Sequence, residues 1–297
     1  MRIDDLPGLA AAAPRPPRGR ARSAAARARA LLPYPFLVVG AVVMAVPLYV
    51  MVVTSLKTTG EFYRNPFGLP SSPSLANYAD AWVQGQMNSF FWNSVVISLG
   101  TVALTLTGAT LAGYALARMR VRGAGVIFYL LLGTLMVPTE IILLPIFTLF
   151  RDLHLLNTYV GLIIPYASLG MAFSTYLLRG FFRTLPAELA EAARIDGCGE
   201  FGTFWRVMLP LSLPGVATVA VFSFIGAWSE FFLASLFISS QELRPITAGL
   251  FRFSEQYRTN WSAMSAGYTI VITPIVVFFL LLQRYFIRGL TAGALKG

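Results

Sequence analysis

This sequence of 297 residues has few of the side chains on which most enzymes and metalloproteins rely. Cys198 is its single cysteine, and His154 is its single histidine. One cysteine excludes an internal disulfide framework, and one histidine excludes a metal site built from several histidines. We expect Cys198 to be a small turn residue and His154 to lie in a solvated loop.

Lysine is also scarce, since Lys57 and Lys296 are the only two. No Gly-x-x-x-x-Gly-Lys-Ser/Thr sequence occurs, so the chain has no Walker A loop to hold the phosphates of ATP. There is also no His-Glu-x-x-His motif and no serine nucleophile elbow. The sequence therefore predicts a chain that is not an enzyme, with no catalytic residue, no metal and no cofactor.

Charged residues are scarce as well. Charged residues make up 12% of the chain, against about 25% in soluble globular proteins. Hydrophobic residues make up 56%, and the mean hydropathy is +0.67. Several apolar stretches reach about 20 residues, the length that crosses a hydrocarbon core of about 30 Å. The sequence predicts an all-α integral membrane protein with six transmembrane helices, at about residues 34–56, 92–117, 126–147, 158–178, 211–237 and 265–283.

The chain divides by composition into three regions. Residues 1–33, rich in Ala, Pro and Arg, are expected to form a basic, disordered cytoplasmic tail. A cleavable signal peptide is the alternative, but the apolar run that follows is longer than a signal-peptide core, and no cleavage site follows it. Residues 34–89 hold the first span and a polar, aromatic extracytoplasmic segment, and residues 90–297 hold the remaining spans.

Basic residues are unevenly divided between the two sides of these spans. Of the 23 lysines and arginines, 17 lie in the terminal segments, in the turn between the second and third spans, and in the loop between the fourth and fifth. Loops rich in Lys and Arg stay in the cytosol. This predicts that both termini and the loop at residues 179–210 are cytosolic.

That loop contains a polar island with its own helix signals. Pro186 suits a first helical turn and Gly197 suits the position just past a helix end, so a helix is predicted over residues 186–196. Glu188 and Glu191 lie three apart on one face, where a cationic partner would relieve their repulsion. An adjacent face of small side chains would let another surface approach closely: Ala187, Ala190 and Ala193.

A second, amphipathic helix is predicted after Gly197. Its apolar residues fall at helical spacing and form one stripe, which we expect to tie this helix to the transmembrane bundle: Phe201, Phe204, Trp205, Met208 and Leu209. Pro210 is expected to end the helix.

Three short sequences in the island resemble the EAA motif of ABC importer permease subunits: Glu191-Ala192-Ala193, Asp196-Gly197 and Leu209-Pro210. In that family the loop is a cytoplasmic coupling helix that docks into a cleft on a cytosolic ATPase subunit. This chain departs from the family pattern at Cys198-Gly199, where a small residue and then Ser are frequent. A loop helix that only packs on its own domain is the alternative. The resemblance implies the following ATPase-coupling residues: Pro186, Glu188, Leu189, Glu191, Ala192, Ala193, Asp196 and Gly197.

Other segments are similar to the carbohydrate, maltose-type branch of these permeases: Lys57-Thr58-Thr59-Gly60-Glu61-Phe62, Asn77-Tyr78 and residues 283–297. The resemblance covers most of residues 34–297 and implies that residues 90–297 are the permease core. It implies a multi-pass subunit of the bacterial inner membrane that forms half of the path for a sugar. The implied partners are a second, different permease, two ATP-binding subunits that use the ATP, an extracytoplasmic solute-binding protein and membrane lipid, without nucleic acid.

Two acids, a tryptophan and a serine in the predicted spans are candidates for lining the substrate path. Intramembrane carboxylates are costly and usually face a cavity or a partner. Glu140 lies in the third span, and Glu230 follows Trp228 and Ser229 in the fifth. Trp228 would stack on a sugar ring. The alternative for each acid is a structural carboxylate that caps backbone groups or pairs with the partner subunit.

Two other functions are open at this point. One is the same class of importer with a non-sugar solute, such as glycerol phosphate or a polyamine, although the C-terminal segment favours a sugar. The other is a self-sufficient secondary transporter, which would favour acids or interrupted helices near the bilayer midplane. That alternative leaves the polar island unexplained.

Overall fold

A computed structural model of the chain describes residues 33–294, with side chains up to Gln283. Apart from residue 33, the predicted basic tail lies outside the described residues, and so do residues 295–297. Every regular element in the described part is a helix, and that part contains no strand. The prediction of an all-α membrane protein is therefore confirmed.

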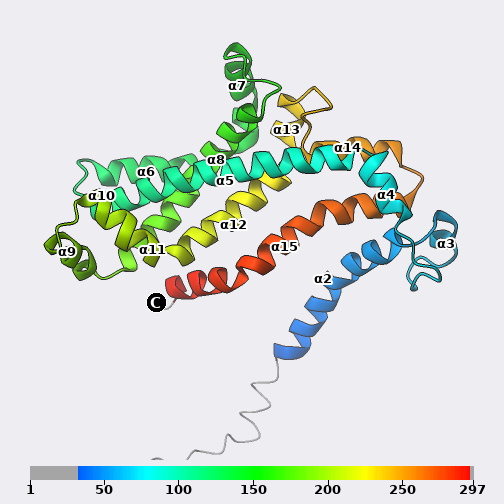
Figure 1. The fold of residues 1–297 in the computed structure, drawn as a ribbon, viewed down its shortest axis with the longest axis horizontal. Coiled ribbons are helices and arrows are strands. Elements are labelled where there is room, and N and C mark those ends of the chain that lie inside the picture. The colour runs from blue at the N-terminus through cyan, green and yellow to red at the C-terminus, as the bar shows by residue number, and fades with distance from the viewer. Residues whose placement is uncertain (1–32, 295–297) are drawn as a thin grey trace, which may run out of the picture. The chain divides into compact units, whose positions relative to one another are not determined.

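The helices are labelled in Figure 1. In chain order they are α2 (Pro33–Ser55), α3 (Thr59–Arg64), α4 (Ala76–Val83), α5 (Met87–Arg118), α6 (Ala124–Thr134), α7 (Thr139–Asp152), α8 (Tyr159–Thr184), α9 (Ala187–Ile195), α10 (Glu200–Thr203), the π-helix η2 (Phe204–Met208), α11 (Leu209–Leu211), α12 (Leu213–Ser229), α13 (Phe232–Phe237), α14 (Ile246–Gln256) and α15 (Trp261–Ala294).

Four of the described helices are long and apolar enough to cross a membrane: α2, α5, α8 and α15. The number reaches six when each of two bent helix pairs counts as one span. The chain also divides into two compact units, one that ends at Tyr49 and one that begins at Val50, so the boundary falls within α2.

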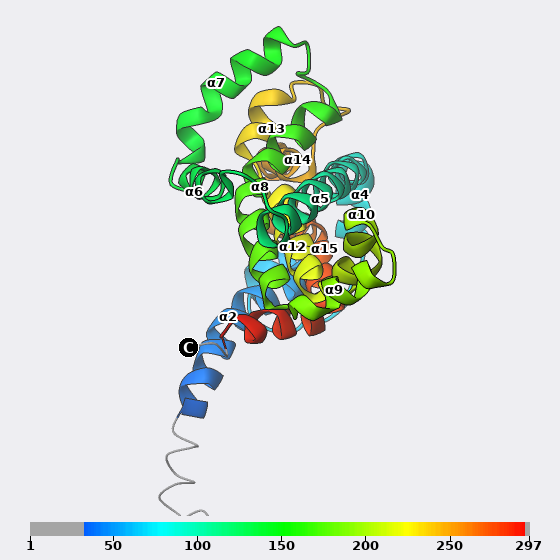
Figure 2. The same cartoon turned by 90° about the vertical axis from the view of Figure 1, so that its left-hand side faces the viewer.

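The third predicted span is wrong as a single helix. It is divided into α6 and α7, which are bent by 98°. Pro138 stands at the break with extended backbone angles (φ −59°, ψ 131°). Proline has no N–H to donate and disfavours helical angles in the residue before it, so the helix ends ahead of it. As a result α7 projects away from the bundle formed by α5, α8 and α12 (Figure 2).

The fifth and sixth predicted spans also have different bounds. The fifth ends at Ser229, because Glu230 is extended (φ −71°, ψ 132°), and the short α13 follows. The sixth begins at Trp261 and continues past Gln283 to Ala294.

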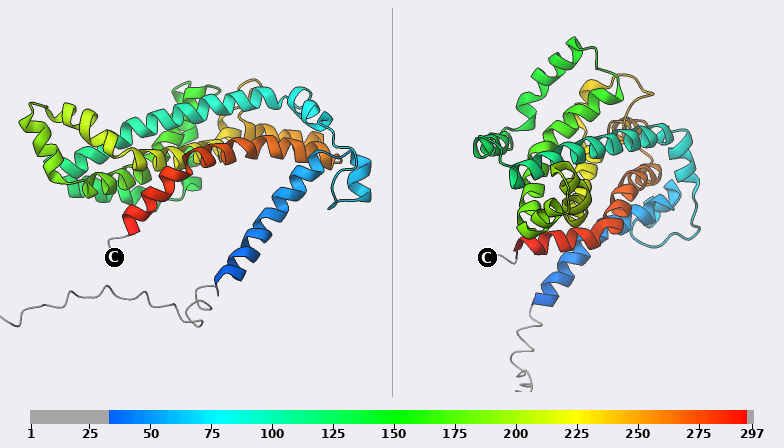
Figure 3. Two further views of the ribbon diagram at one scale, coloured as in Figure 1. Left: turned by 60° about the horizontal axis from the view of Figure 1, so that its bottom comes forward. Right: turned by 60° about the vertical axis from the view of Figure 1, so that its left-hand side comes forward.

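Small residues allow the long helices to pack closely. α12 packs on α5, α8 and α15, and α5 packs along α8 (Figure 3). A Cβ added at Gly113 of α5 would lie 3.1 Å from the backbone nitrogen of Arg179 in α8. One added at Gly108 would lie 2.6 Å from Cε of Met171. At these two glycines α5 and α8 approach closely because no Cβ lies between them.

The segment after α2 is held by side-chain hydrogen bonds to backbone carbonyls. Lys57 is fully buried, and its Nζ donates to the Asn65 carbonyl at 2.7 Å and to the Pro66 carbonyl at 3.2 Å. Nδ2 of Asn77 donates to the Ser55 and Lys57 carbonyls, both at 2.8 Å. Lys57 and Asn77, which belong to the sequences similar to carbohydrate permeases, thus stabilise the fold of this segment.

Candidate coupling loop and solute path

The helix predicted over residues 186–196 is present as α9, which is one residue shorter at each end. Pro186 is predicted in the first helical turn but stands just before it, as the N-cap, with extended backbone angles (φ −58°, ψ 139°). Its side chain makes no capping hydrogen bond. The proline ring fixes φ and thereby restricts the direction in which the chain passes from α8 into α9.

The end of α9 is a Schellman motif. Gly197 has φ +85°, the left-handed conformation predicted for it. The backbone N–H of Cys198 donates to the Ala193 carbonyl at 2.9 Å, and that of Gly197 donates to the Arg194 carbonyl at 3.1 Å. These are the 6→1 and 5→2 hydrogen bonds that define the motif. The turn therefore forms even though Cys198 and Gly199 depart from the family pattern.

One face of α9 is packed against the chain itself. Ala190 and Ala193 are each 5% exposed. Ala190 lies in the same apolar cluster as Phe204 and Met208 of η2. The thin alanine face therefore does let another surface approach closely, and at Ala190 that surface is η2 of the same loop.

The opposite face of α9 is open. Glu188, Leu189 and Glu191 are exposed. Ile195, in the last turn of α9, is 86% exposed. Neither glutamate makes an ion pair with any residue that the structure describes. The predicted acidic face is present, with apolar side chains beside it and no ion pair to any described cation.

The single apolar stripe predicted for the second helix is wrong. Phe204 and Met208 are buried, but Phe201 is 71% and Trp205 is 60% exposed. Their two exposed rings stack on each other, with centroids 6.4 Å apart and planes 9° apart. Residues four apart still share a face, since Phe204 and Met208 are on the buried side and Phe201 and Trp205 on the exposed side, so the predicted stripe is divided between two faces of the segment that contains the π-helix at residues 204–208.

Pro210 does not end the second helix as predicted. It lies in the first turn of α11, where its missing N–H costs little. The chain bends by 77° one element later, between α11 and α12. The intervening residue, Ser212, donates its backbone N–H to the carbonyls of Met208 and Leu209.

The loop is tied to the transmembrane helices by an arginine and an aromatic cluster. Nε of Arg118, at the end of α5, donates to the Phe182 carbonyl at 2.9 Å, and Nη2 donates to the same carbonyl and to that of Leu185. The Tyr114 ring of α5 lies 5.5 Å from Phe182 of α8 and 5.0 Å from Phe204 of η2. α5 thus holds the end of α8, Leu185 between α8 and α9, and the second helix of the loop.

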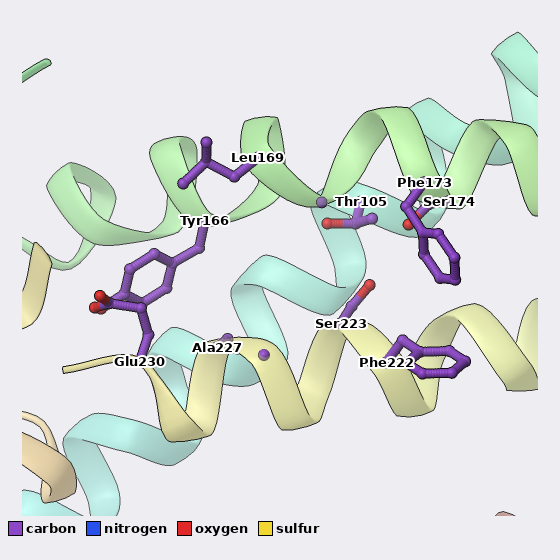
Figure 4. A pocket seen from close by; sticks show the side chains of 11 residues that line it. Thr105, Tyr166, Leu169, Phe173, Ser174, Phe222, Ser223, Ala227 and Glu230 are labelled. Carbon is purple, nitrogen blue, oxygen red and sulfur yellow. The ribbon is translucent and has the colours of Figure 1, made fainter. Parts of the chain in front are cut away.

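A cavity of about 200 Å³ lies between α5, α8 and α12 (Figure 4). Tyr166 and Glu230 lie together at one end of it, and Phe173 and Phe222 at the other. Its volume is below the roughly 300–1,000 Å³ of typical ligand sites. It is lined by Thr105, Tyr166, Leu169, Gly170, Phe173, Ser174, Phe222, Ser223, Gly226, Ala227 and Glu230.

The carboxylate of Glu230 is fully engaged within the chain. It accepts hydrogen bonds from the Tyr166 hydroxyl at 2.6 Å, from the Leu233 N–H at 2.9 Å and from the Ala234 N–H at 3.0 Å. The last two are donors of the first turn of α13, which a helix cannot satisfy by itself. Glu230 therefore caps α13, as the structural alternative predicts.

Comparison with known proteins identifies the family. Residues 105–292, more than half of the chain, match the family described as binding-protein-dependent transport system inner membrane component. This chain belongs to that family. Its members are permease subunits of ABC transporter systems and are not themselves enzymes, as the missing catalytic motifs predict.

Relatives of this permease support the carbohydrate branch. A probable ABC transporter permease of Bacillus subtilis, YurM, is 38% identical over 262 residues, which cover 88% of this chain and 87% of the relative. The sulfoquinovosyl glycerol permease SmoH of Agrobacterium fabrum is 37% identical, with 82% and 86% covered. The arabinooligosaccharide permease AraQ of Halalkalibacterium halodurans is 36% identical, with 86% and 93% covered. The predicted resemblance to carbohydrate ABC permeases is confirmed.

A solved structure shares the permease fold. It is a chain of a bacterial ABC transporter involved in the import of the acidic polysaccharide alginate, with a TM-score of 0.77 and 24% identity. The match covers 89% of this chain and 98% of that one. The all-α permease fold predicted from the sequence agrees with this neighbour.

The other candidates for the path of this permease lie in different surroundings. Trp228 is 1% exposed, its indole Nε1 donates to the Val271 carbonyl at 3.0 Å, and its ring packs 5.5 Å from that of Phe224. Ser229 and Glu140 are exposed, and neither lines the cavity. The structure therefore brings only Glu230 to the cavity, and the role of all four residues in the path stays a prediction.

The structural role of Arg118 is not predicted from the sequence, in which it is one of the positive charges on the expected cytosolic side. A signal was present, because a cation in the last turn of a helix often binds nearby carbonyls. The sequence does not show that these carbonyls belong to α8, because 64 residues separate Arg118 from Phe182.

Proposed function

We propose that this permease is one of two different permease subunits in an ATP-driven sugar importer of a bacterial inner membrane, with both termini in the cytosol. Two ATP-binding subunits bind and hydrolyse the ATP, and the permease itself takes no cofactor. An extracytoplasmic protein delivers the solute. The names of the relatives, which refer to sugars and glycosides, support a sugar as the cargo.

The observation that carries this proposal is the acidic outer face of α9. Glu188 and Glu191 are exposed without a cationic partner in the described residues, while the inner face is packed on η2. A basic cleft on the ATPase complements this face, and electrostatic complementarity fixes the orientation of docking. The proposed coupling residues are Pro186, Glu188, Leu189, Glu191, Ala192, Ala193, Asp196 and Gly197; Ala193 acts from the packed side, by holding α9 in place.

Motion then passes from the docked helix to the membrane through the contacts of Arg118. ATP binding closes the two ATPase subunits and moves α9. Since Arg118 bonds the carbonyls at the end of α8 and just before α9, this motion displaces α5 and α8 together. The cavity between α5, α8 and α12 lies where such a displacement widens or closes a path.

Co-purification from membranes tests the docking surface. The tagged wild-type permease should retain the ATPase subunit, and Glu191→Lys should lose it because a cation then faces a basic cleft. Glu242→Lys is the matched control, since Glu242 is an exposed glutamate of the α13–α14 connection. It should retain the ATPase. Full ATPase retention and normal sugar uptake in Glu191→Lys would refute the proposal.

A further inference from the structure

A second cavity, of about 520 Å³, lies at the other end of the Val50–Gly297 unit. Figure 1 shows α4 and α14 at one end of this unit and α9 and α10 at the opposite end. The cavity opens between the turn from α4 to α5, the α13–α14 connection and α14. Its volume falls in the roughly 300–1,000 Å³ range of ligand sites. It is lined by Gln84, Gly85, Gln86, Phe90, Gln241, Arg244, Arg252, Phe253, Glu255 and Gln256.

Arg244 is a buried cation with an unused donor. It is 8% exposed, and its Nη1 is buried without a hydrogen-bond partner among the described residues. Nη2 donates to the Ser239 carbonyl at 3.3 Å, and the carbonyl of Arg244 accepts from Nδ2 of Asn93 at 2.9 Å. The residue is therefore held in place while part of its guanidinium lacks a partner. A buried charged donor without a partner costs free energy, which an anion in the cavity would recover.

Arg252 brings a second positive charge to the same cavity. Burial, and after it the charge of Arg252, lowers the pKa of Arg244. Glu255 also lines the cavity, but no described carboxylate makes an ion pair with either arginine. Two arginines thus line one cavity, and the planar fork of a guanidinium group matches a carboxylate.

The rest of the lining suits a polyhydroxylated ring. Four glutamines offer amide donors and acceptors: Gln84, Gln86, Gln241 and Gln256. Nε2 of Gln241 donates to Oε1 of Gln86 at 2.5 Å, which joins two walls of the cavity. The Phe90 and Phe253 side chains, 3% and 2% exposed, supply its apolar part. The Phe253 ring lies so close to Gly85 that any Cβ at Gly85 would collide with it.

We propose that this cavity binds an acidic sugar, a uronic acid residue whose carboxylate lies on Arg244 and Arg252 and whose hydroxyls meet the glutamine amides. The carboxylate of a single protein side chain would fill only a small part of 520 Å³. By the distribution of charge this end of the chain faces the extracytoplasmic side, where a solute arrives. That the ligand is a solute of the importer rests on the proposed function, whereas binding of the acid to the cavity does not.

Direct binding to the purified importer complex in lipid nanodiscs tests the proposal. Galacturonate is the probe, and galactose is the control, because it has the same ring and hydroxyls without the carboxylate. Titration should show galacturonate binding at least about tenfold tighter than galactose, since charge-assisted hydrogen bonds to both arginines are lost without the carboxylate. Binding should weaken as salt increases.

Variants assign the binding to this cavity. Arg252→Gln changes an exposed side chain and should weaken galacturonate binding by about tenfold without affecting folding. Arg244→Gln should do the same, and Arg258→Gln, an exposed arginine outside the lining, is the matched control that should bind normally.

Three outcomes would overturn the proposal: equal affinity for galacturonate and galactose, unchanged binding in both cavity variants, or acetate binding as tightly as galacturonate. The last result would indicate a site for any carboxylate, including that of a partner protein. ATPase retention and the uptake of a neutral sugar are separate measurements, so failure of this site leaves the proposed function standing, and the reverse also holds.

Discussion

Gly197 is the residue at which the coupling loop depends most on backbone conformation. Its φ is +85°, and a Cβ added to it would meet no atom within 4 Å. A β-branched residue there is therefore strained by the backbone alone, by about 1–2 kcal/mol per residue. We predict that Gly197→Val inserts at normal abundance but tilts α9. Sugar uptake should collapse, and stimulation of ATP hydrolysis by the solute-binding protein should be lost.

Gly199 provides the matched control for that substitution. A Cβ there also meets nothing within 4 Å, but its backbone is extended, with φ −68° and ψ 172°. Gly199→Val should leave uptake near the wild-type rate. If Gly197→Val transported normally in the same assay, the left-handed turn would not be needed for coupling.

Trp228 presents a choice between packing and substrate contact. Its ring is buried and its indole N–H is bonded to Val271. We predict that Trp228→Ala costs about 3–5 kcal/mol and lowers the amount of assembled complex, measured by abundance and thermal stability in detergent. Trp228→Phe should assemble, because it keeps most of the packing. Normal assembly of Trp228→Ala together with lost uptake would instead support the path role.

At the scale of elements, α13 depends on the Glu230 cap. The carboxylate accepts from the N–H groups of Leu233 and Ala234. Glu230→Ala should destabilise the start of α13 by about 1 kcal/mol. Amide hydrogen exchange at Leu233 and Ala234 should become faster by about fivefold. Ser229→Ala, one residue earlier and exposed, should leave exchange unchanged; equal exchange in both variants would exclude the cap.

Arg118 is the element-scale link between α5, α8 and the coupling loop. Its guanidinium donates to the carbonyls of Phe182 and Leu185. Arg118→Ala should leave the ATPase bound through α9 but lower uptake per ATP hydrolysed, measured in proteoliposomes. Arg120→Ala, an exposed neighbour with no hydrogen bond in the described structure, should transport normally. If Arg118→Ala left the ratio of sugar uptake to ATP hydrolysis unchanged, this arginine would have no role in coupling.

At the scale of the whole molecule, orientation is the property to test. The distribution of Lys and Arg predicts a cytosolic coupling loop. In a Cys198→Ser background, Glu200→Cys should react with a membrane-impermeant maleimide only after the cells are permeabilised. Glu242→Cys should react in intact cells. Labelling of Glu200→Cys from outside intact cells would show that the coupling loop is extracytoplasmic, which would contradict the proposed function.

Properties that depend on neighbouring residues in the chain were predictable from the sequence. Hydropathy summed over about 20 residues identifies a span. The left-handed turn at Gly197 follows from glycine's lack of a Cβ. The EAA-like residues of the coupling loop are also adjacent in the chain, and they indicated the permease family. The family match over residues 105–292 confirms that assignment.

Tertiary structure alone decided what each helix face contacts. Periodicity grouped Phe201, Phe204 and Trp205 on one stripe, but of these three only Phe204 is buried, in the apolar cluster that η2 forms with Ala190 of α9. Trp228 lies in the core because Val271 and Phe224 meet it there. Burial and unsatisfied donors depend on residues far apart in the chain, as in the acidic-sugar cavity, whose lining extends from Gln84 to Gln256. No local sequence pattern predicts which distant residues come into contact, because these contacts depend on the free energy of packing whole helices together.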